Sequence, residues 1–351
     1  MRVLVTGSAG FIGSAIRRQL EAEGDEVVGV DLMLPQAHGT GEPSAGTHRL
    51  DVRDAESWTR LLDGVDTVCH QAALVGAGVR VSDLPLYAAH NDLGTAALLS
   101  AMHVAGVDRL VLASSMVVYG EGRYACPEHG AQAPGPRREA DLESGRFDHA
   151  CPTCGRALSW ELVDEDARLD PRSGYAASKL AQEHYAAAWA RQAGGAVVAL
   201  RYHNVYGPGM PRETPYSGVA AMFRSSLERG EPPQVYEDGG QMRDFVHVED
   251  VARANVLALR AVTAAEPGGF TAYNVCSGLP VAISEVAALV AEGAATPKQP
   301  VVTGRFRPGD VRHVVASPRK AADELDFVAA IRPDEGLPAF ATAPLRGSPA
   351  R

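Results

Sequence analysis

Two side chains that could carry out proton transfer stand four positions apart in "YAASK", where Tyr175 precedes Lys179. On a helix, positions i and i+4 lie on one face, so the ammonium group would lie beside the phenol. A nearby cation favours the phenolate, and we therefore expect the pKa of Tyr175 to fall from its usual value of about 10 towards neutrality. A phenolate can act as a general base towards a substrate hydroxyl. A packed tyrosine and a surface lysine explain this pair better when it is taken alone, and Ser115, at the end of "LVLASS", is by itself an ordinary hydroxyl.

Four candidate metal ligands stand in two matching pentapeptides, "CPEHG" and "CPTCG". Each pentapeptide puts two soft ligands three positions apart, Cys126 with His129 and Cys151 with Cys154. One imidazole and three thiolates form a closed tetrahedral set for structural zinc. Four incidental residues in a flexible loop would not explain two matching pentapeptides. Because such a set leaves no open position, we expect the zinc to fold the surrounding segment rather than to take part in catalysis.

A glycine-rich turn, "TGSAGFIG", follows the first apolar run of the chain and precedes an amphipathic segment. Gly7, Gly10 and Gly13 would let the backbone approach a pyrophosphate closely, and the helix N-terminus would supply amide donors. Asp31 closes the second expected strand, where an acidic side chain holds the ribose hydroxyls and repels a 2′-phosphate. The turn therefore predicts a dinucleotide site that prefers NAD to NADP. Asp51–Val52, after the third expected strand, could reach the adenine, although a surface aspartate fits that position nearly as well.

The elements that would hold these residues alternate between strand and helix patterns over the first 115 residues. The apolar runs "RVLVTG", "EVVGVD", "DTVCHQAA" and "DRLVLASS" alternate with amphipathic segments such as "FIGSAIRRQLEAEG" and "NDLGTAALLSAMHVAG". Buried strands separated by amphipathic helices predict an α/β fold with a Rossmann-type doubly wound parallel sheet. A helix resumes at "SGYAASKLAQEHYAAAWARQ", and a further strand follows at "AVVALRY".

Changes in composition along the chain predict its domain organisation. We expect an NAD-binding Rossmann domain over residues 1–202, because the strand and helix patterns continue to that point. Residues 121–170 lose periodicity and are rich in Gly, Pro and charge, which indicates an insertion that carries the zinc knuckles. A smaller substrate-binding domain is expected over residues 203–340, where the pattern loosens. Residues 341–351 have little apolar content and are expected to fray.

The overall composition argues against several functional classes. The net charge of −10 argues against a nucleic-acid partner. We expect no membrane span, because the chain has no run of 18 apolar residues. The opening "MRVLVTGSAG" lacks the layout of a signal peptide, so a cytoplasmic protein is expected. Five cysteines in a chain of this length do not form a disulfide framework, and Cys69 and Cys276, in strand patterns, are expected to be buried and inert.

Eight motifs occur in the order that one protein family shows. They are "TGSAGFIG", "HQAA" at 70–73, "SSMVVYG" at 114–120, "YAASK" at 175–179, "RYHNVYGPG" at 201–209, "RDFVHVEDVA" at 243–252, "YNVCSG" at 273–278 and "RPGD" at 307–310. From residue 1 to about residue 330 the chain resembles the extended short-chain dehydrogenase/reductase family. Within it the chain is most similar to the NAD-dependent nucleotide-sugar epimerase/dehydratase branch, and there to the dTDP-L-rhamnose 4-epimerase type of sequence.

This resemblance implies a role for each matching residue. The catalytic triad would be Ser115, Tyr175 and Lys179. The implied NAD contacts are Gly7, Gly10, Phe11, Ile12, Gly13, Asp31, Asp51, Val52, Ala72, Ala73, Asn91, Tyr175, Lys179 and Tyr202. The implied contacts with a nucleotide-sugar substrate are Ser115, Met116, Val117, Asn204, Arg243, Arg307 and Asp310. The resemblance also implies a homodimer in which helices near 90–105 and 175–192 pair.

The two positions after Ser115 separate the reactions of this branch. Dehydratases of the family have an Asp-Glu pair there, and the sugar decarboxylases also need an acidic residue. This chain has Met116 and Val117, which can neither donate nor accept a proton. The remaining reaction is 4-epimerisation through a transient 4-keto sugar. In this reaction C4 is oxidised and the hydride then returns to its opposite face. Reduction of a keto sugar is the alternative, but it would more naturally use NADPH, against which Asp31 argues.

The expected substrate follows from the lining of the sugar site. Met116, Val117 and "ALVGAGV" at 73–79 offer no charged group, and such a lining suits a 6-deoxy sugar. This favours a dTDP-6-deoxyhexose such as dTDP-L-rhamnose, with interconversion of UDP-glucose and UDP-galactose as the alternative. A non-catalytic NAD-binding sensor or scaffold belongs to a different class. Such proteins usually lose the Tyr-Lys pair, which this chain keeps.

Overall fold

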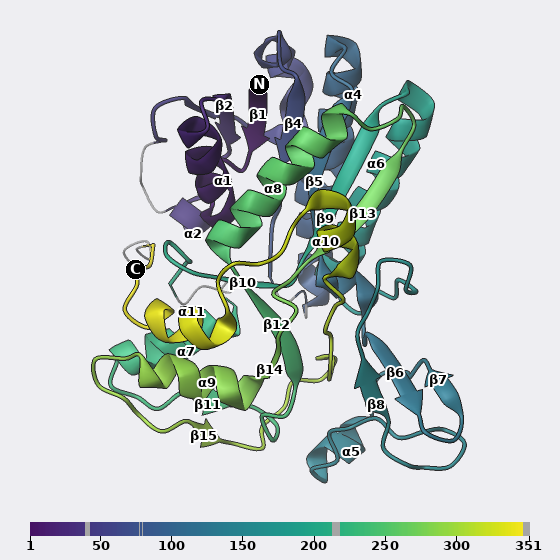
Figure 1. Ribbon diagram of the computed structural model, residues 1–351, viewed down its shortest axis with the longest axis vertical. Coiled ribbons are helices and arrows are strands. Elements are labelled where there is room, and N and C mark those ends of the chain that lie inside the picture. The colour runs from purple at the N-terminus through teal and green to yellow at the C-terminus, as the bar shows by residue number, and fades with distance from the viewer. Residues whose placement is uncertain (39–42, 77, 79, 213–217, 347–351) are drawn as a thin grey trace.

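A parallel sheet of seven strands forms the centre of the part of the chain that the computed structural model describes, residues 1–38, 43–76, 78, 80–212 and 218–346 (Figure 1). The predicted α/β architecture is therefore confirmed. In spatial order the strands are β13 (Phe270–Val275), β9 (Ala196–Tyr202), β5 (Arg109–Ser115), β4 (Thr67–His70), β1 (Arg2–Thr6), β2 (Glu26–Asp31) and β3 (Thr47–Arg49).

Helices cover both faces of this sheet, which explains why its inner strands, such as β1 and β5, are nearly continuous apolar runs rather than alternating ones. On one face Ile16 and Leu20 pack with Val251 of a distant helix, and on the other Leu98 and Met102 pack with Trp189. The helices of the first face are α1 (Phe11–Ala22), α8 (Val248–Thr263) and α10 (Arg319–Leu325). Those of the second face are η1 (Val52–Leu62), α4 (Gly94–Ala105) and α6 (Gly174–Ala193).

The order of the strands decides where a ligand can bind. β1 lies between β2 and β4, so the connections that leave β1 and β4 turn towards opposite faces of the sheet. In such sheets a crevice opens outside the carboxyl ends of the strands at this point, and ligands bind there. The glycine turn follows β1, and the "HQAA" motif begins with His70, the last residue of β4.

The smaller part of the molecule packs helices against two short sheets below the carboxyl ends of the central strands (Figure 1). The chain passes between the two parts more than once, because α8 and β13 follow the first small strands and return to the central sheet. Its helices are α7 (Val219–Glu228), α9 (Ile283–Glu292) and α11 (Pro333–Phe340). Its strands are β10 (Asn204–Tyr206), β12 (Met242–His247), β14 (Pro280–Ala282), β11 (Gln234–Val235) and β15 (Val301–Val302).

The end of the described chain is docked rather than frayed. The backbone N–H of Gly209 donates to the carbonyl of Pro344 at 2.7 Å, and the N–H of Arg346 donates to the carbonyl of Met210 at 3.1 Å. The prediction of fraying is therefore wrong for residues 341–346, because backbone pairing fixes a segment that has little apolar content. Residues 347–351 lie outside the described residues.

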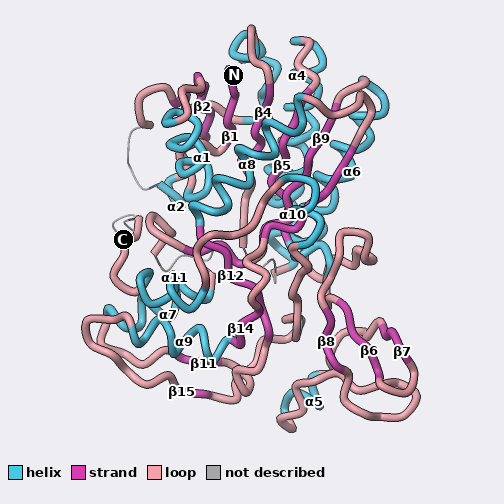
Figure 2. Tube along the Cα trace, in the orientation of Figure 1, coloured by secondary structure: helices cyan, strands magenta, loops and turns pink. Residues whose placement is uncertain are grey.

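The insertion forms a separate arm with little regular structure (Figure 2). Its strands form an antiparallel sheet in the order β7-β6-β8. One short helix lies between β7 and β8 in the sequence. The bounds are β6 (Arg123–Cys126), β7 (Gly130–Gln132), α5 (Glu139–Glu143) and β8 (Ser159–Glu161). The remaining short elements are α2 (Pro35–His38), η2 (Val81–Asp83), α3 (Leu84–Tyr87), η3 (Ala88–Leu93) and η4 (Met116–Tyr119). Among the described helices, none has both the length and the apolar content needed to span a bilayer.

Candidate active site

A cavity of about 980 Å³ lies between the central sheet and the smaller part of the chain. It brings together nearly all the residues that the sequence singled out for a cofactor and a substrate. Those that line it are Gly7, Gly10, Phe11, Ile12, Gly13, Asp31, Asp51, Val52, Ala72, Ala73, Ser115, Met116, Val117, Tyr175, Lys179, Tyr202, Asn204, Arg243, Arg307 and Asp310.

The glycine turn after β1 is packed too tightly for larger residues. A Cβ on Gly13 would lie 2.1 Å from the carbonyl oxygen of Gly7, and Gly7 itself has a φ of 66°. Helix α1 begins directly after Gly10, which provides no side-chain cap. The amide groups of the first turn are therefore left for another acceptor, and the positive end of the helix dipole favours an anion there. This end of the cavity fits the pyrophosphate of a dinucleotide.

Asp31 is held ionised at the end of β2. Burial opposes ionisation, but hydrogen bonds from His38 and from the backbone amides of Met33 (2.8 Å) and Ala9 (3.0 Å) outweigh it and lower the pKa of Asp31. His38 lies 3.4 Å from the carboxylate, and Nη1 of Arg346 approaches His38 to 3.5 Å. The carboxylate lines the cavity as expected for a group that accepts ribose hydroxyls.

Asn91 does not line the cavity, in contrast to the role expected for it. It is fully buried in η3, a turn of π-helix. Its Oδ1 accepts the amide of Leu74 at 2.7 Å, and its Nδ2 donates to the carbonyl of Leu74 (2.9 Å) and to Oγ of Ser178 (2.8 Å). Its side-chain amide thus links the segment after β4 to α6. Through these bonds it supports Leu74, which lines the cavity.

Tyr175 and Lys179 lie in the first turns of α6, beside the end of β5. The helix is capped by Ser173, whose hydroxyl accepts the amide of Ala176 at 3.2 Å. Nζ of Lys179 donates to the carbonyl of Ala113 at 3.0 Å. At the end of the same strand, the hydroxyl of Ser115 lies close enough to the Tyr175 phenol to affect its pKa, and it accepts the amide of Val117 at 3.4 Å. The sheet and the helix therefore bring the three predicted catalytic side chains together at the cavity.

The charge state of this group differs from the expectation. Burial raises the pKa of Tyr175 above its ordinary value, although the nearby Ser115 hydroxyl opposes the rise. Burial also lowers the pKa of Lys179 to about 8, and the nearby Glu183 carboxylate offsets only part of the effect. The phenol borders the cavity, but protein atoms crowd around it closely enough for desolvation to prevail. The predicted lowering of the tyrosine pKa by the lysine is thus wrong for the protein without a ligand.

A buried ion pair fixes α6 against the sheet. Arg201 of β9 and Glu183 of α6 meet at 2.8 Å, and both side chains are almost wholly enclosed. Ser114, next to Ser115, donates to the same carboxylate. Glu183 lies one turn beyond Lys179, so this pair sets the position of the helix that carries Lys179 relative to β5.

Two arginines lie at the opposite end of the cavity, together with the carboxyl groups of Glu237 and Asp310. The guanidinium of Arg243 donates to the carbonyls of Met242, Val311 and Arg312 at 2.7 to 2.8 Å. No ion pair among the described residues includes Arg243, so its charge is available to a phosphate. The guanidinium of Arg307 stacks 5.0 Å from the ring centre of Tyr236.

Asn204 and Asp310 also reach this end of the cavity. Nδ2 of Asn204 donates to the carbonyl of Asp244 at 2.9 Å and is thereby held in place. Burial raises the pKa of Asp310, although Arg307 and Arg243 oppose the rise. Both residues line the cavity, as expected from the sequence.

The four candidate metal ligands converge at the far end of the insertion. Their ligand atoms all lie within 4.8 Å of one another. Sγ of Cys126 lies 3.5 Å from Nδ1 of His129 and 3.7 Å from Sγ of Cys154, and Sγ of Cys151 lies 3.6 Å from the same nitrogen. A tetrahedral ion with Zn–S bonds of about 2.3 Å requires S···S separations of about 3.8 Å. The backbone amides of Glu128 and His129 point at Cys126 and lower the pKa of its thiol. The donor set therefore fits zinc in both geometry and chemistry.

Comparison with known proteins identifies the family. A model of the NAD dependent epimerase/dehydratase family matches residues 3–147 and 153–276. The chain belongs to this family of enzymes. Within the family it is 36% identical to a dTDP-L-rhamnose 4-epimerase of Burkholderia thailandensis, over 89% of this chain and 86% of that one. Two solved structures of the family are similar over 97% of this chain. MoeE5 in complex with UDP-glucuronic acid and NAD has a TM-score of 0.75, 32% identity and 97% of its chain covered. The UDP-glucose 4-epimerase of Thermus thermophilus in complex with NAD has a TM-score of 0.74, 34% identity and 98% of its chain covered.

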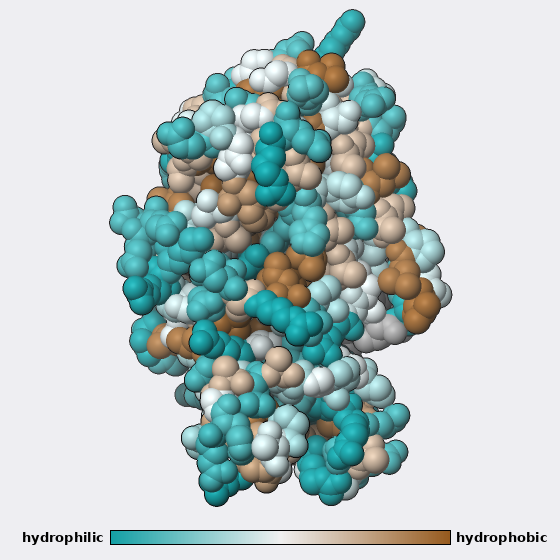
Figure 3. Space-filling view, turned by 90° about the vertical axis from the view of Figure 1, so that its right-hand side faces the viewer, coloured by the Kyte–Doolittle hydropathy of each residue, from teal (hydrophilic) through white to brown (hydrophobic). Residues whose placement is uncertain are grey.

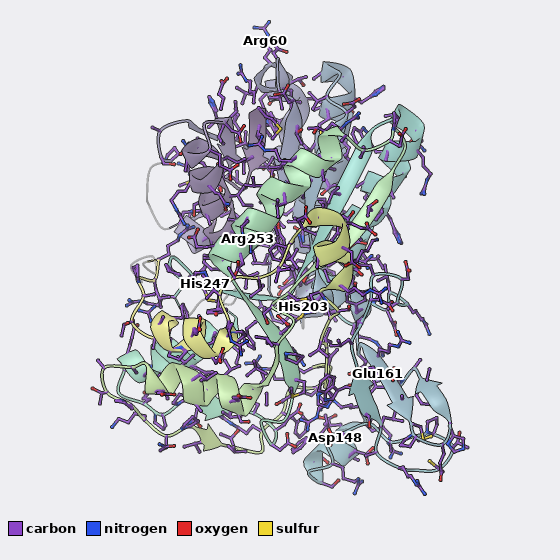
Figure 4. All side chains as sticks on the ribbon, in the orientation of Figure 1. Arg60, Asp148, Glu161, His203, His247 and Arg253 are labelled. Carbon is purple, nitrogen blue, oxygen red and sulfur yellow. The ribbon has the colours of Figure 1, made fainter. Side chains whose placement is uncertain are left out.

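Several residues that line the cavity were not predicted. Arg346 comes from the docked tail and meets His38, 308 positions away in the sequence. His203 lies where the central sheet meets the smaller part (Figure 4), and burial, with a contribution from Arg243, lowers its pKa to about 3 and keeps it neutral. No local sequence signal marks Arg346. The position of His203, inside "RYHNVYGPG" and next to Tyr202, could have drawn attention to it.

Proposed function

We propose that the protein is an NAD-dependent nucleotide-sugar 4-epimerase. The observation that carries this proposal is the meeting of Ser115, Tyr175 and Lys179 midway along one cavity. At one end of that cavity lie the glycine turn and Asp31, and at the other lie Arg243 and Arg307. A dinucleotide bound at the first end and a nucleotide diphosphate sugar bound at the second would meet beside the phenol of Tyr175.

In this proposal the chain's own residues hold the cofactor. The amides at the start of α1 bind the pyrophosphate, Asp31 accepts the adenosine ribose hydroxyls, and Tyr202 and Ala72–Ala73 border the inner half. NAD, when bound, supplies the hydride acceptor and returns the hydride. The ionised Asp31 disfavours the 2′-phosphate of NADP, since two negative groups would be buried together.

The proton transfer is assigned to the side chains at the end of β5 and the start of α6. The free site keeps the phenol of Tyr175 protonated, so the proposal requires that it be ionised once the ligands are bound. As the phenolate, Tyr175 takes the proton of the sugar's 4-hydroxyl and later gives it back, while Ser115 hydrogen-bonds the reacting oxygen. Lys179, one turn along α6, stabilises the phenolate when it forms. Enclosure of this group excludes bulk water and strengthens each of these contacts.

The lining of the sugar end supports epimerisation over elimination of water. Met116 and Val117 follow Ser115 and offer no proton donor or acceptor. Among the described lining residues the carboxylates lie elsewhere. Asp31 is the last residue of β2 and Asp51 follows β3, while Glu237 and Asp310 lie with the arginines at the nucleotide end.

The substrate we favour is a dTDP-6-deoxyhexose such as dTDP-L-rhamnose. Its 6-methyl suits the uncharged lining at Met116 and Val117, and the relative in Burkholderia thailandensis is named for this sugar. Interconversion of UDP-glucose and UDP-galactose is the second candidate, because the Thermus thermophilus neighbour carries that name. Purified protein should be incubated with dTDP-L-rhamnose and with UDP-glucose, and the C4 configuration of the products read by NMR. Faster turnover of UDP-glucose would refute the substrate, and net reduction instead of interconversion would refute the epimerase.

We also propose that the insertion binds one structural zinc ion through Cys126, His129, Cys151 and Cys154. The fit of the sulfur and nitrogen separations to a tetrahedral ion supports this assignment. The ion would hold the arm folded, since the arm's own apolar cluster is small. Metal analysis of purified protein should find about one zinc per chain, and absence of zinc would refute the assignment.

A homodimer formed by α4 and α6 is proposed on exposed apolar residues of these helices and of the short turns that precede α4. Val104 of α4 is 75% exposed, and Tyr185 of α6 is 48% exposed. In the preceding turns Val81 is 79% exposed, and Leu86 and Leu93 are about half exposed. Figure 3, which shows the right-hand side of the molecule as drawn in Figure 1, has small apolar patches among polar side chains. A second copy of the chain would cover them. Light scattering should give the mass of two chains, and Val104→Asp should reduce it to that of one.

A further inference from the structure

The insertion meets the nucleotide end of the cavity through buried arginines. Arg137 lies between the two ligand pairs in the sequence and reaches Glu237 in the smaller part of the chain. Nη1 and Nη2 donate to the two carboxylate oxygens, each at 2.8 Å, and the two side chains are only 5% and 2% exposed. Nη2 also donates to the carbonyl of Asp310 at 2.7 Å, and Nη1 to that of Phe147 at 3.2 Å. One guanidinium from the arm thus holds two segments of the cavity wall.

The segment that Arg137 holds is under strain. Glu237 has a φ of 55°, a left-handed conformation that costs a residue with a Cβ of order 1 kcal/mol or more. It lines the cavity and follows Tyr236, on which the guanidinium of Arg307 stacks. Such a conformation persists only where the surroundings fix it. Here the N–H of Glu237 donates to the carbonyl of Arg305 at 2.7 Å, and its carbonyl accepts the N–H of Gly304 at 3.2 Å. The fork of Arg137 and a further bond from Nη1 of Arg312, at 2.9 Å, hold the carboxylate of the same residue.

The same contacts lead back to the metal-ligand cluster. Asp148, three residues before Cys151, accepts Nε of Arg312 at 2.8 Å. It lies on the side of the arm that faces the smaller part of the chain (Figure 4). The hairpin that carries Cys151 and Cys154 begins there, since the amide of Leu158 donates to the carbonyl of His149 at 2.8 Å.

The base of the insertion is anchored separately near the catalytic strand. The amide of Val163 donates to the carbonyl of Val315, and the amide of Ser317 to the carbonyl of Val163, each at 2.9 Å. The amide of Asp170 donates to the carbonyl of Val118 at 2.8 Å. These bonds do not depend on the metal-ligand cluster, so loss of the cluster should disturb the nucleotide wall before it disturbs Tyr175.

We infer that Arg137 is a positioning residue for the nucleotide of the substrate, and that the metal-bearing arm acts on nucleotide binding through it. The inference rests on the proposed function for the identity of the ligand, a nucleoside diphosphate. Arg137 orders Glu237 and Asp310, and these segments hold Tyr236 and Arg307 in place for the base and the diphosphate. The arm is therefore part of the substrate site, although the insertion lies outside the central sheet.

Binding of free dTDP and UDP, measured by calorimetry on the full chain, tests this directly. Arg137→Met should raise the dissociation constant of both by about 10-fold or more, because the bidentate fork is lost. Arg137→Lys keeps the charge without the fork and should recover only part of the affinity. Turnover at saturating substrate should change by no more than about threefold, which separates positioning from catalysis. Arg146→Met, which removes an exposed arginine of the same arm, is the matched control and should bind as the wild type does.

The effect of the metal on nucleotide binding is tested by the same calorimetric measurement. Cys154→Ser should release zinc and weaken dTDP binding as Arg137→Met does, with NAD still bound. Wild-type affinity for both nucleotides in Arg137→Met, or in Arg137→Lys if the first variant does not fold, would overturn the inference. Normal nucleotide binding by a metal-free variant would overturn the link to the metal. If the nucleotides bind as expected but no sugar is epimerised, the proposed function fails while the role of Arg137 stands.

Discussion

Replacement of Lys179 by methionine should make the folded protein more stable and much less active. Burial lowers the pKa of Lys179 from 10.5 to about 8. One pKa unit is worth about 1.4 kcal/mol, so the charged form costs the folded state roughly 3 kcal/mol at pH 7. Methionine fills a similar volume without the charge, although loss of the hydrogen bond to the Ala113 carbonyl offsets about 1 kcal/mol. The variant should therefore be about 2 kcal/mol more stable at pH 7.

The stability difference between Lys179→Met and the wild type should depend on pH in a defined direction. Below pH 8 both the folded and the unfolded chain keep the proton on Lys179, so the cost is constant. Between pH 8 and about 10.4 the unfolded chain holds more protons than the folded one, and the stability of the wild type rises with pH. The cost of the charge should fall by about 2.5 kcal/mol between pH 7 and pH 10, so the advantage of Lys179→Met should nearly vanish by pH 10.

Urea unfolding followed by tryptophan fluorescence at pH 7, 8, 9 and 10 measures this difference, with the dinucleotide content matched between variants. Lys298→Met, at an exposed lysine, is the control and should change little. Turnover of Lys179→Met should fall by about 100-fold or more, since the phenolate loses its cation. Two results would refute the reasoning that the charge on Lys179 destabilises the folded state. One is a Lys179→Met variant that is less stable than the wild type at pH 7. The other is a stability difference between the two proteins that does not change with pH.

Three further predictions concern the cavity. Tyr175→Phe should lower turnover by about 100- to 10,000-fold with nucleotide affinity intact, and full turnover by steady-state assay would point to another base. Gly13→Ala should abolish NAD binding, because its Cβ would lie 2.1 Å from the Gly7 carbonyl oxygen; NAD retained on purification, read by absorbance, would contradict the packing. Asp31→Ser should improve binding of NADP relative to NAD, because a buried negative charge is removed, and an unchanged preference in calorimetric titrations would assign the selectivity to other residues.

The central fold could be predicted from sequence because each element carries its own signal. A strand buried on both faces must be apolar throughout, as "AVVALRY" is, and every residue of β9 is buried. The glycine turn could be predicted for the same reason, since only glycine allows the approach of Gly13 to Gly7. The cluster of candidate metal ligands was predicted because ligand spacing within each pentapeptide is a local property, and the structure brings the two pairs together.

The predictions that were wrong depended on contacts between distant segments. Asn91 was expected to contact the cofactor, but its side-chain amide forms hydrogen bonds with the backbone of Leu74, in the segment after β4. The tail was expected to fray, and its pairing with Met210 cannot be read from its own composition. The pKa of Tyr175 was expected to fall, because spacing reveals the neighbouring cation but not the protein atoms that exclude water from the pair.

The sequence alone determined the fold class, the glycine turn, the Tyr-Lys pair and the two metal-ligand pentapeptides, because periodicity and short spacing fix each of them within a few residues. Only the tertiary structure decided that Arg137 of the insertion closes on Glu237 and Asp310, segments 100 and 173 positions away. The physical reason is that a buried ion pair forms only where two distant segments bring opposite charges together and exclude water. That meeting is a property of the folded chain and has no signature in either segment alone.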